Sequence, residues 1–139
     1  MPELPFRILG IEHVGIAVDD LNGISDVFGD LLGLELRSRE KIDDQQVITD
    51  IYETGSGKLE FLKATDPDSP ISRFIEKKGT GMHHISLIVD NLQAALDYLK
   101  GEGTKLIDTS PRIGAEGFKI AFLHPRSTSG ILVELCEKN

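Results

Sequence analysis

The feature of this 139-residue chain that most restricts its fold is an internal repeat. The stretch EHVGIAVDDLNGISDVFGDL at 12–31 aligns with HHISLIVDNLQAALDYLKGE at 83–102 at a constant offset of 71 residues. Five pairs between 11–28 and 82–99 are identical, against roughly one expected from average residue usage. The identical pairs are His13 and His84, Val18 and Val89, Asp19 and Asp90, Leu21 and Leu92, and Asp26 and Asp97. A duplication brings equivalent residues together around a pseudo-twofold axis.

Each copy reads as a strand, an Asp-rich cap and a helix, followed by further strands. The later strands are predicted at 35–42, 46–54 and 57–64 in the first copy, and at about 105–109, 118–124 and 130–136 in the second. Between the copies, Ser69 is a suitable helix cap, Pro70 suits the first helical position, and Gly79 ends the turn. A short linker helix is therefore expected.

The predicted fold is α+β and forms a single domain over residues 1–139. It has two tandem β-α-β-β-β modules, at about 8–64 and 82–137, and the linker helix lies within 65–81. The two modules are expected to form one curved, partly open, eight-stranded sheet around a functional site, with the helices outside.

The charge of the chain restricts its partners. The net charge is −8 and no run of Lys or Arg exceeds two residues, which argues against nucleic acid and anionic membranes but leaves a small anionic ligand open. The single Cys136 excludes an intrachain disulfide and is expected to pack in the core. The N-terminus lacks the features of a signal peptide, and no apolar run approaches the ~18 residues of a membrane span. A cytoplasmic location is expected.

Two adjacent histidines, His83 and His84, begin an apolar segment that reads as a strand. Successive side chains of a strand point to opposite faces, so only one of the two can enter any one site. The repeat pairs His84 with His13, whereas His83 pairs with Glu12. We therefore expect His13 and His84 to point inward and His83 to support packing.

Two glutamates lie in the middle of apolar strands, Glu60 in KLEFL and Glu134 in LVELC. Taken alone, either could face solvent at a sheet edge; if buried, its charge must be compensated. Together with His13 and His84 they would compensate one another best as ligands of one divalent metal ion. Oxygen and imidazole donors favour Co, Mn, Ni, Fe or Zn in a catalytic site, with positions left for water or substrate.

These residues and modules resemble the vicinal oxygen chelate superfamily over about residues 8–137. The segments EHVGIAVDDL, DSPISRFIEKKGTGMHHISLIVDNL and IGAEGFKIAFLHPRSTSGILVEL are most similar to the methylmalonyl-CoA epimerase branch of that superfamily. The second segment discriminates best, because its linker helix leads into Gly-Met-His-His. This resemblance implies an isomerase with His13, Glu60, His84 and Glu134 as metal ligands, cobalt first and Zn, Mn or Ni as alternatives.

The resemblance also implies a chemistry. The acidic C2 proton of methylmalonyl-CoA would be removed to give an enolate stabilised by the metal ion, and a proton would return on the opposite face. Glu134 is implied to be both ligand and base. The partners implied are an acyl-CoA substrate and a second copy of the chain in a homodimer.

The second acid or base is less well defined. Some members of the family carry a glutamate on the strand equivalent to 46–54, where this chain has Thr49 and then Asp50. If Thr54 paired with Lys58, Asp50 would share the face of Glu60, so Asp50 is the preferred candidate, with Thr49 and water as alternatives.

Arg112, Lys119 and Arg126 are candidates for contacts with the coenzyme A phosphates, whereas His124, which precedes a proline, is expected to be structural. Three other functions fit the same resemblance. Glyoxalase I would use the same four ligands on a glutathione hemithioacetal, a bleomycin-resistance-type binding module would not need all four, and an extradiol dioxygenase would use two His and one Glu around iron.

Overall fold

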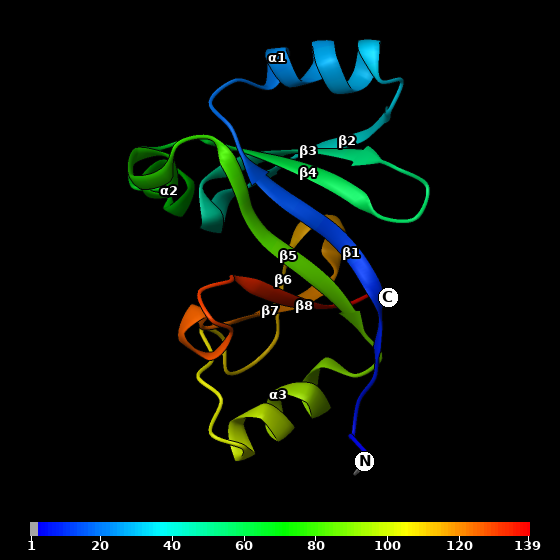
Figure 1. Cartoon of the computed structure of the whole chain (residues 1–139), viewed down its shortest axis with the longest axis vertical. Coiled ribbons are helices and arrows are strands. Elements are labelled where there is room, and N and C mark those ends of the chain that lie inside the picture. The colour runs from blue at the N-terminus through cyan, green and yellow to red at the C-terminus, as the bar shows by residue number, and fades with distance from the viewer. Residues whose placement is uncertain (1–2) are drawn as a thin grey trace. The chain divides into compact units, whose positions relative to one another are not determined.

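Two strands, β1 (Ile8–Ala17) and β5 (Gly81–Val89), run through both halves of the protein (Figure 1). The structure is a computed structural model that describes residues 3–139, and it contains two units. The central unit is His13–His83, and the terminal unit combines the residues up to Glu12 with His84–Asn139. Each of the two strands therefore contributes one part to each unit. The strand order is β2-β3-β4-β1-β5-β8-β7-β6.

In the central unit, three strands form an antiparallel meander and β4 runs parallel to β1. The meander consists of β2 (Glu35–Ile42), β3 (Val47–Glu53) and β4 (Lys58–Ala64), close to the predicted ranges. The turn between β3 and β4 is closed by a hydrogen bond from the Thr54 amide to the Gly57 carbonyl. Gly55 within this turn has φ +104°, a conformation that favours glycine.

One face of the central sheet is covered by the first helical segment. Asp20 caps α1 (Leu21–Ile24), and the chain continues into the π-helical η1 (Ser25–Leu31). Its side chains pack against Tyr52 and Phe61, and the rings of Phe28 and Phe61 lie 4.8 Å apart. Burial of this aromatic cluster fixes the side of the sheet on which α1 and η1 lie.

The linker helix α2 (Pro70–Lys78) packs on the opposite face of the central sheet. The Ser69 hydroxyl accepts a hydrogen bond from the Ile71 amide at 3.2 Å, Pro70 occupies the first turn, and Gly79 ends the helix with φ +77°. The cap, start and stop predicted from the sequence are therefore confirmed. Buried Ile71 lies against Leu62 and other apolar residues of that face.

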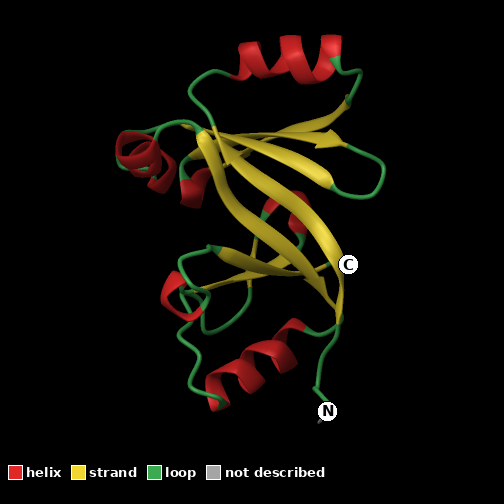
Figure 2. Ribbon diagram, viewed as in Figure 1, coloured by secondary structure: helices red, strands yellow, loops and turns green. Residues whose placement is uncertain are grey.

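The terminal unit repeats this plan. After β5, Asn91 caps α3 (Leu92–Gly101), and the chain then forms β6 (Arg112–Ile113), β7 (Lys119–Leu123) and β8 (Val133–Glu137). Strand β8 is parallel to β5 and antiparallel to β7. The core under α3 is apolar and contains Val89, Leu92, Leu96, Ala121 and Leu135. The predicted α+β class with two β-α-β-β-β modules is confirmed (Figure 2).

One predicted strand is wrong. Residues 105–109 form only an isolated bridge from Leu106 to Leu123, and the short edge strand is instead β6. Asp108 explains the difference, because its carboxylate accepts a hydrogen bond from the Phe122 amide at 2.8 Å and so replaces a strand partner.

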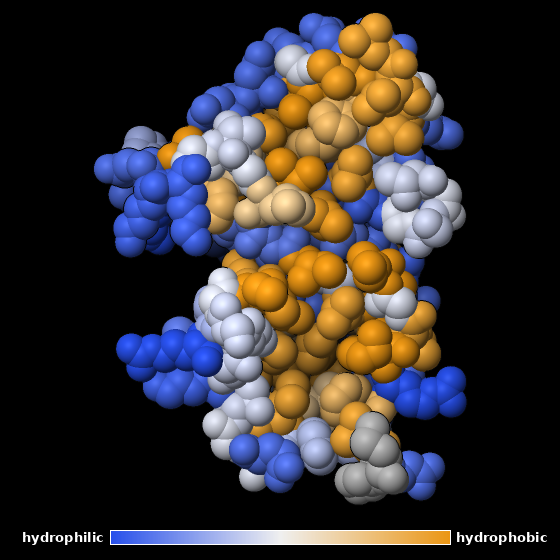
Figure 3. All heavy atoms as spheres, viewed as in Figure 1, coloured by the Kyte–Doolittle hydropathy of each residue, from blue (hydrophilic) through white to orange (hydrophobic). Residues whose placement is uncertain are grey.

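Apolar side chains also remain on the surface of the central unit. Figure 3 shows hydrophobic residues gathered over the end of η1, and the exposed members there and at the start of β2 are Val27, Leu31, Leu32 and Leu36. Leu31 is 79% exposed, well beyond what a core residue shows. Within residues 3–139, none of the helices has the length and apolar character required to cross a bilayer.

Candidate active site

The central unit contains a buried histidine–glutamate pair. His13 lies on β1 and Glu60 in the middle of β4, and His13 Nδ1 is 2.9 Å from Glu60 Oε2. The two side chains are 6% and 5% exposed. In the parallel register Gly15 lies opposite Glu60, so His13, two residues earlier, shares its face. The imidazole thus provides the polar partner that a buried carboxylate requires.

The terminal unit repeats this register. Ser86 of β5 lies opposite Glu134 of β8, and His84 precedes Ser86 by two residues, as His13 precedes Gly15. His84, Ser86 and Glu134 are all buried. Each unit therefore supplies one buried His and one buried Glu at equivalent places, residue types that bind divalent metal ions. The sequence duplication reappears as an identical strand register.

Ser86 is the difference between the two copies. Its hydroxyl is buried and has no hydrogen-bond partner among residues 3–139, whereas the equivalent Gly15 has no side chain. An unpaired buried hydroxyl costs free energy, of the order of 1–3 kcal/mol. Such a group next to Glu134 marks a place where a ligand atom can pair with it.

Asp50 does not lie where the sequence placed it. The expected pairing of Thr54 with Lys58 is wrong: Glu53 pairs with Lys58, and Ile51 pairs with Glu60. Because side chains alternate along a strand, this shift of one residue moves Asp50 to the face opposite Glu60. The cause is the turn, in which the Thr54 amide bonds to Gly57 and not to Lys58.

Asp50 has a structural partner on its own face. Arg39 of β2 donates two hydrogen bonds to its carboxylate, at 2.6 and 2.9 Å, and Asp50 is 1% exposed. The hydrogen bond and the charge of Asp50 raise the pKa of Arg39 above its usual value. This bidentate pair accounts for the burial of Asp50 without a role in chemistry.

Thr49 takes the place on the Glu60 face that had been assigned to Asp50. It is fully buried, and its hydroxyl has no hydrogen-bond partner within the described chain. Across β2 it lies opposite Glu40, which is half-buried and accepts a long hydrogen bond of 3.4 Å from Ser38. The alternation of Ser38, Glu40 and Ile42 along β2 was a usable signal for Glu40, which the sequence reasoning did not consider.

His83 packs away from the His84 side chain, as expected for adjacent residues of a strand. Its ring lies 5.0 Å from that of Phe74 of α2 at an interplanar angle of 81°. Burial, assisted by the nearby charge of Lys78, lowers the pKa of His83 to about 4. His83 is therefore neutral at neutral pH and serves as a packing residue between β5 and α2.

The residues proposed for the coenzyme are partly engaged elsewhere in the terminal unit. Arg112 Nε lies 3.1 Å from Asp108, and Lys119 Nζ lies 4.0 Å from Glu137. Arg126 is exposed on a short 3₁₀ turn.

The structural readings of His124 and Cys136 agree with the structure. His124 Nδ1 accepts the Arg126 amide at 3.1 Å and so caps the 3₁₀ turn. Cys136 is buried beside Ile120 and Phe122.

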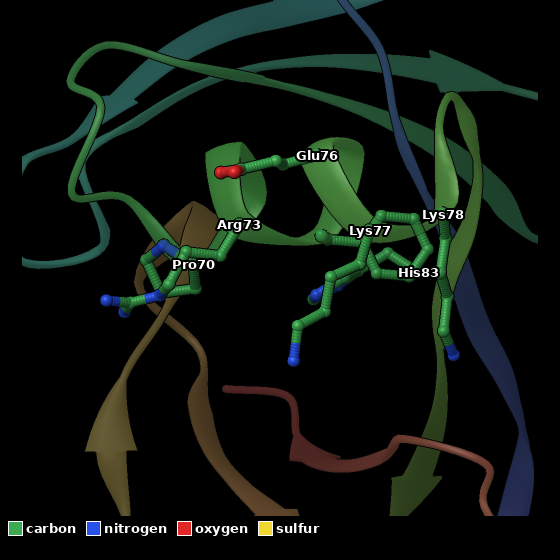
Figure 4. Close-up of a pocket in the computed structure, with 7 residues that line it drawn as sticks. Pro70, Arg73, Glu76, Lys77, Lys78 and His83 are labelled. Atoms are coloured by element: carbon green, nitrogen blue, oxygen red, sulfur yellow. The ribbon is translucent and has the colours of Figure 1, made fainter.

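Sequence reasoning missed a basic pocket beside α2 (Figure 4). Its volume is about 480 Å³, and it is lined by Pro70, Arg73, Phe74, Glu76, Lys77, Lys78 and His83. The signal was present in the sequence, because Arg73 and Lys77 are four residues apart on a predicted helix and therefore share a face.

The chain matches the Glyoxalase/Bleomycin resistance protein/Dioxygenase superfamily over residues 12–122. It is 36% identical to the ethylmalonyl-CoA/methylmalonyl-CoA epimerase of Cereibacter sphaeroides, with 90% of this chain and 95% of that protein covered. The solved structure of methylmalonyl-CoA epimerase from Mycobacterium tuberculosis is 30% identical, with a TM-score of 0.90 over 95% of this chain and 89% of that chain. A methylmalonyl-CoA epimerase in complex with methylmalonyl-CoA and NH4+ is 28% identical, with a TM-score of 0.89 over 95% and 96% of the two chains.

The match over residues 12–122 defines the class of protein, a member of the glyoxalase, bleomycin resistance protein and dioxygenase superfamily. Within this superfamily, the similarity to these relatives shows that the chain belongs to the methylmalonyl-CoA epimerase family.

Proposed function

We propose that this protein epimerises methylmalonyl-CoA at C2. The observation that carries the proposal is the repeated register of one buried His and one buried Glu in each unit. The relatives named for this activity span nearly the whole chain, and one of them was solved with methylmalonyl-CoA bound. Both support the proposed activity.

We propose that His13, Glu60, His84 and Glu134 hold one divalent metal ion, cobalt in the first instance. The donor set fits: two imidazoles and two carboxylates suit such an ion, and the single cysteine lies in an apolar cluster. The ion would supply a Lewis acid that lowers the free energy of an enolate formed from the thioester.

Side chains of the protein would remove and return the C2 proton. In the proposal, a carboxylate oxygen of Glu134 accepts the C2 proton, and the electron pair of the C–H bond moves into the enolate. In the proposal, the Ser86 hydroxyl, which lies opposite Glu134 and is unpaired, donates a hydrogen bond to an oxygen of the substrate. Inversion then requires a proton delivered to the other face of C2.

With Asp50 on the opposite sheet face, we propose Thr49 and Glu40 as the group that delivers this second proton. Both lie on the face of Glu60, and the Thr49 hydroxyl is buried and unpaired. The hydroxyl would pass a proton from the Glu40 carboxyl to C2 and receive one in the reverse reaction. The direction of turnover then decides which carboxyl, Glu40 or Glu134, starts protonated.

The test is deuterium uptake at C2 of methylmalonyl-CoA in D2O. Metal-stripped protein, protein restored with cobalt and a Glu134→Gln variant are compared side by side. We expect uptake only after restoration and its loss in the variant, because Gln cannot accept a proton. Well-folded, metal-loaded protein that gives no uptake would refute the epimerase proposal, and the glutathione hemithioacetal would then be assayed.

We also propose that two copies associate, as the family likeness suggests. The exposed apolar residues at the end of η1 and the start of β2 offer a surface for this contact. Light scattering should give the mass of a dimer, and Leu31→Glu should shift it to a monomer. A monomeric wild type at micromolar concentration would rule the association out.

A further inference from the structure

The pocket beside α2 concentrates positive charge on an acidic protein. Arg73, Lys77 and Lys78 line it, whereas the whole chain carries −8. None of the three makes an ion pair with a carboxylate among residues 3–139. Lys78 Nζ lies 5.8 Å from the centre of the Phe74 ring, and its charge acts on neighbouring His83. Figure 4 shows Arg73, Lys77 and Lys78 extending on one side of the helix, while Glu76, the one acidic residue of the lining, extends on the other.

The packing and the caps of α2 fix the positions of these cations. Ile71 and Ile75 pack against the sheet, which turns the face carrying Arg73 and Lys77 outward. The two cations are four residues apart, so they lie one above the other on the same face. Ser69 caps the helix at one end and Gly79 stops it at the other, which fixes where the cations project.

Two aromatic side chains line the pocket beside the cations. Phe74 and His83 line the pocket and pack edge to face, and both are half-buried. Flat aromatic surfaces stack on nucleobases irrespective of sequence. A volume of about 480 Å³ falls within the usual range of small-molecule sites. Cations next to an aromatic wall match a ligand that joins phosphates to a purine.

Helix α2, which carries most of the pocket lining, lies on the same side of the central sheet as the His13–Glu60 pair. Helix α2 packs on Ala17 and Leu62, and the strand registers place these two residues on the face of His13 and Glu60. Leu62 follows Glu60 by two residues on β4, so α2 packs on the same sheet face next to the pair. A ligand bound at the pair would therefore have α2, with its cations, as a neighbour on this side of the unit.

We propose that this pocket binds the nucleotide half of the coenzyme A thioester, its phosphates on Arg73, Lys77 and Lys78 and its adenine against Phe74 and His83. The inference rests on the proposed function, because it assumes an acyl-CoA substrate. The proposal assigns the phosphate contacts to Arg73, Lys77 and Lys78, which pair with no carboxylate within residues 3–139. Arg112 and Lys119, the candidates from the sequence, already pair with carboxylates. The flexible pantetheine arm connects the two ends.

The test compares two substrates that differ only in the nucleotide, methylmalonyl-CoA and methylmalonyl-pantetheine. Charge reversal by Arg73→Glu or Lys77→Glu should lower kcat/KM for the CoA thioester by about tenfold or more, since each removes a charge-assisted contact and adds repulsion. The value for the pantetheine thioester should stay within about twofold of the wild type. Lys100→Glu on α3 makes the same charge change on another exposed helix and should alter neither value.

A second measurement does not depend on turnover. Titration calorimetry with adenosine 3′,5′-bisphosphate should show binding to the wild type and to Lys100→Glu, and its loss in Lys77→Glu. Equal effects of the reversals on both thioesters, or unchanged binding of the bisphosphate, would overturn the nucleotide assignment. A wild type that binds the bisphosphate but turns over neither thioester would refute the epimerase proposal and leave the pocket assignment standing.

Discussion

Asp50 and Thr49, adjacent on β3, should respond to mutation in opposite ways. Asp50 accepts two hydrogen bonds from Arg39, at 2.6 and 2.9 Å, and its side chain is 1% exposed. Hydrogen bonds to charged groups contribute about 1.5–3 kcal/mol each. The Arg39 side chain is 54% exposed, so water recovers part of this. We expect Asp50→Asn to lower the free energy of unfolding by about 2 kcal/mol.

For a chain of this length, about 2 kcal/mol corresponds to a fall in Tm of about 7 °C. Thr49→Val removes a buried hydroxyl that has no partner, so the free energy of unfolding should stay the same or rise by about 1 kcal/mol. Its effect should appear in catalysis. Loss of the proposed second proton donor should slow inversion at C2 by about tenfold or more, while Glu134, the proposed base, should still exchange the proton on its own side.

The assay measures inversion and deuterium uptake at C2 in the same D2O reaction, below the Tm of each variant. We expect Thr49→Val to reduce the ratio of inversion to uptake, and Asp50→Asn to leave that ratio within about twofold of the wild type. The reasoning is refuted if Asp50→Asn lowers the ratio while it remains folded, or if Thr49→Val leaves the ratio unchanged. The Tm of each variant is measured separately by thermal unfolding followed by circular dichroism.

Three further outcomes are expected. Glu60→Gln should lower the bound metal per chain after dialysis, measured by mass spectrometry, because it removes one carboxylate of the proposed set; full occupancy would exclude Glu60 as a ligand. Glu40→Gln should reduce the inversion ratio as Thr49→Val does, and an unchanged ratio would leave water as the proton source. Ser86→Ala should leave Tm within about 2 °C, since its hydroxyl makes no bond in the described chain, while KM for methylmalonyl-CoA rises severalfold; a large drop in Tm would instead assign Ser86 a structural role.

Much of the fold could be predicted from short-range sequence patterns. Ser69, Pro70 and Gly79 act through contacts within a few residues of themselves, and the linker helix begins and ends where they predict. The repeat at an offset of 71 residues likewise placed His13 and His84 correctly, because strand periodicity decides which face each side chain takes. The strand predicted at 105–109 does not form, because the backbone amide of Phe122, distant in sequence, donates to the Asp108 carboxylate instead of to a strand partner.

The sequence by itself determined the duplication, the helix limits and the matched His and Glu of each copy, since all of these depend on short-range periodicity. Only the tertiary structure decided which residue of β3 shares the face of Glu60. Register depends on how the Thr54–Gly57 turn closes, and a slip of one residue exchanges Asp50 for Thr49. It also decided that α2 packs on the face of His13 and Glu60, because helix docking depends on apolar residues of separate strands that come together only in the folded chain.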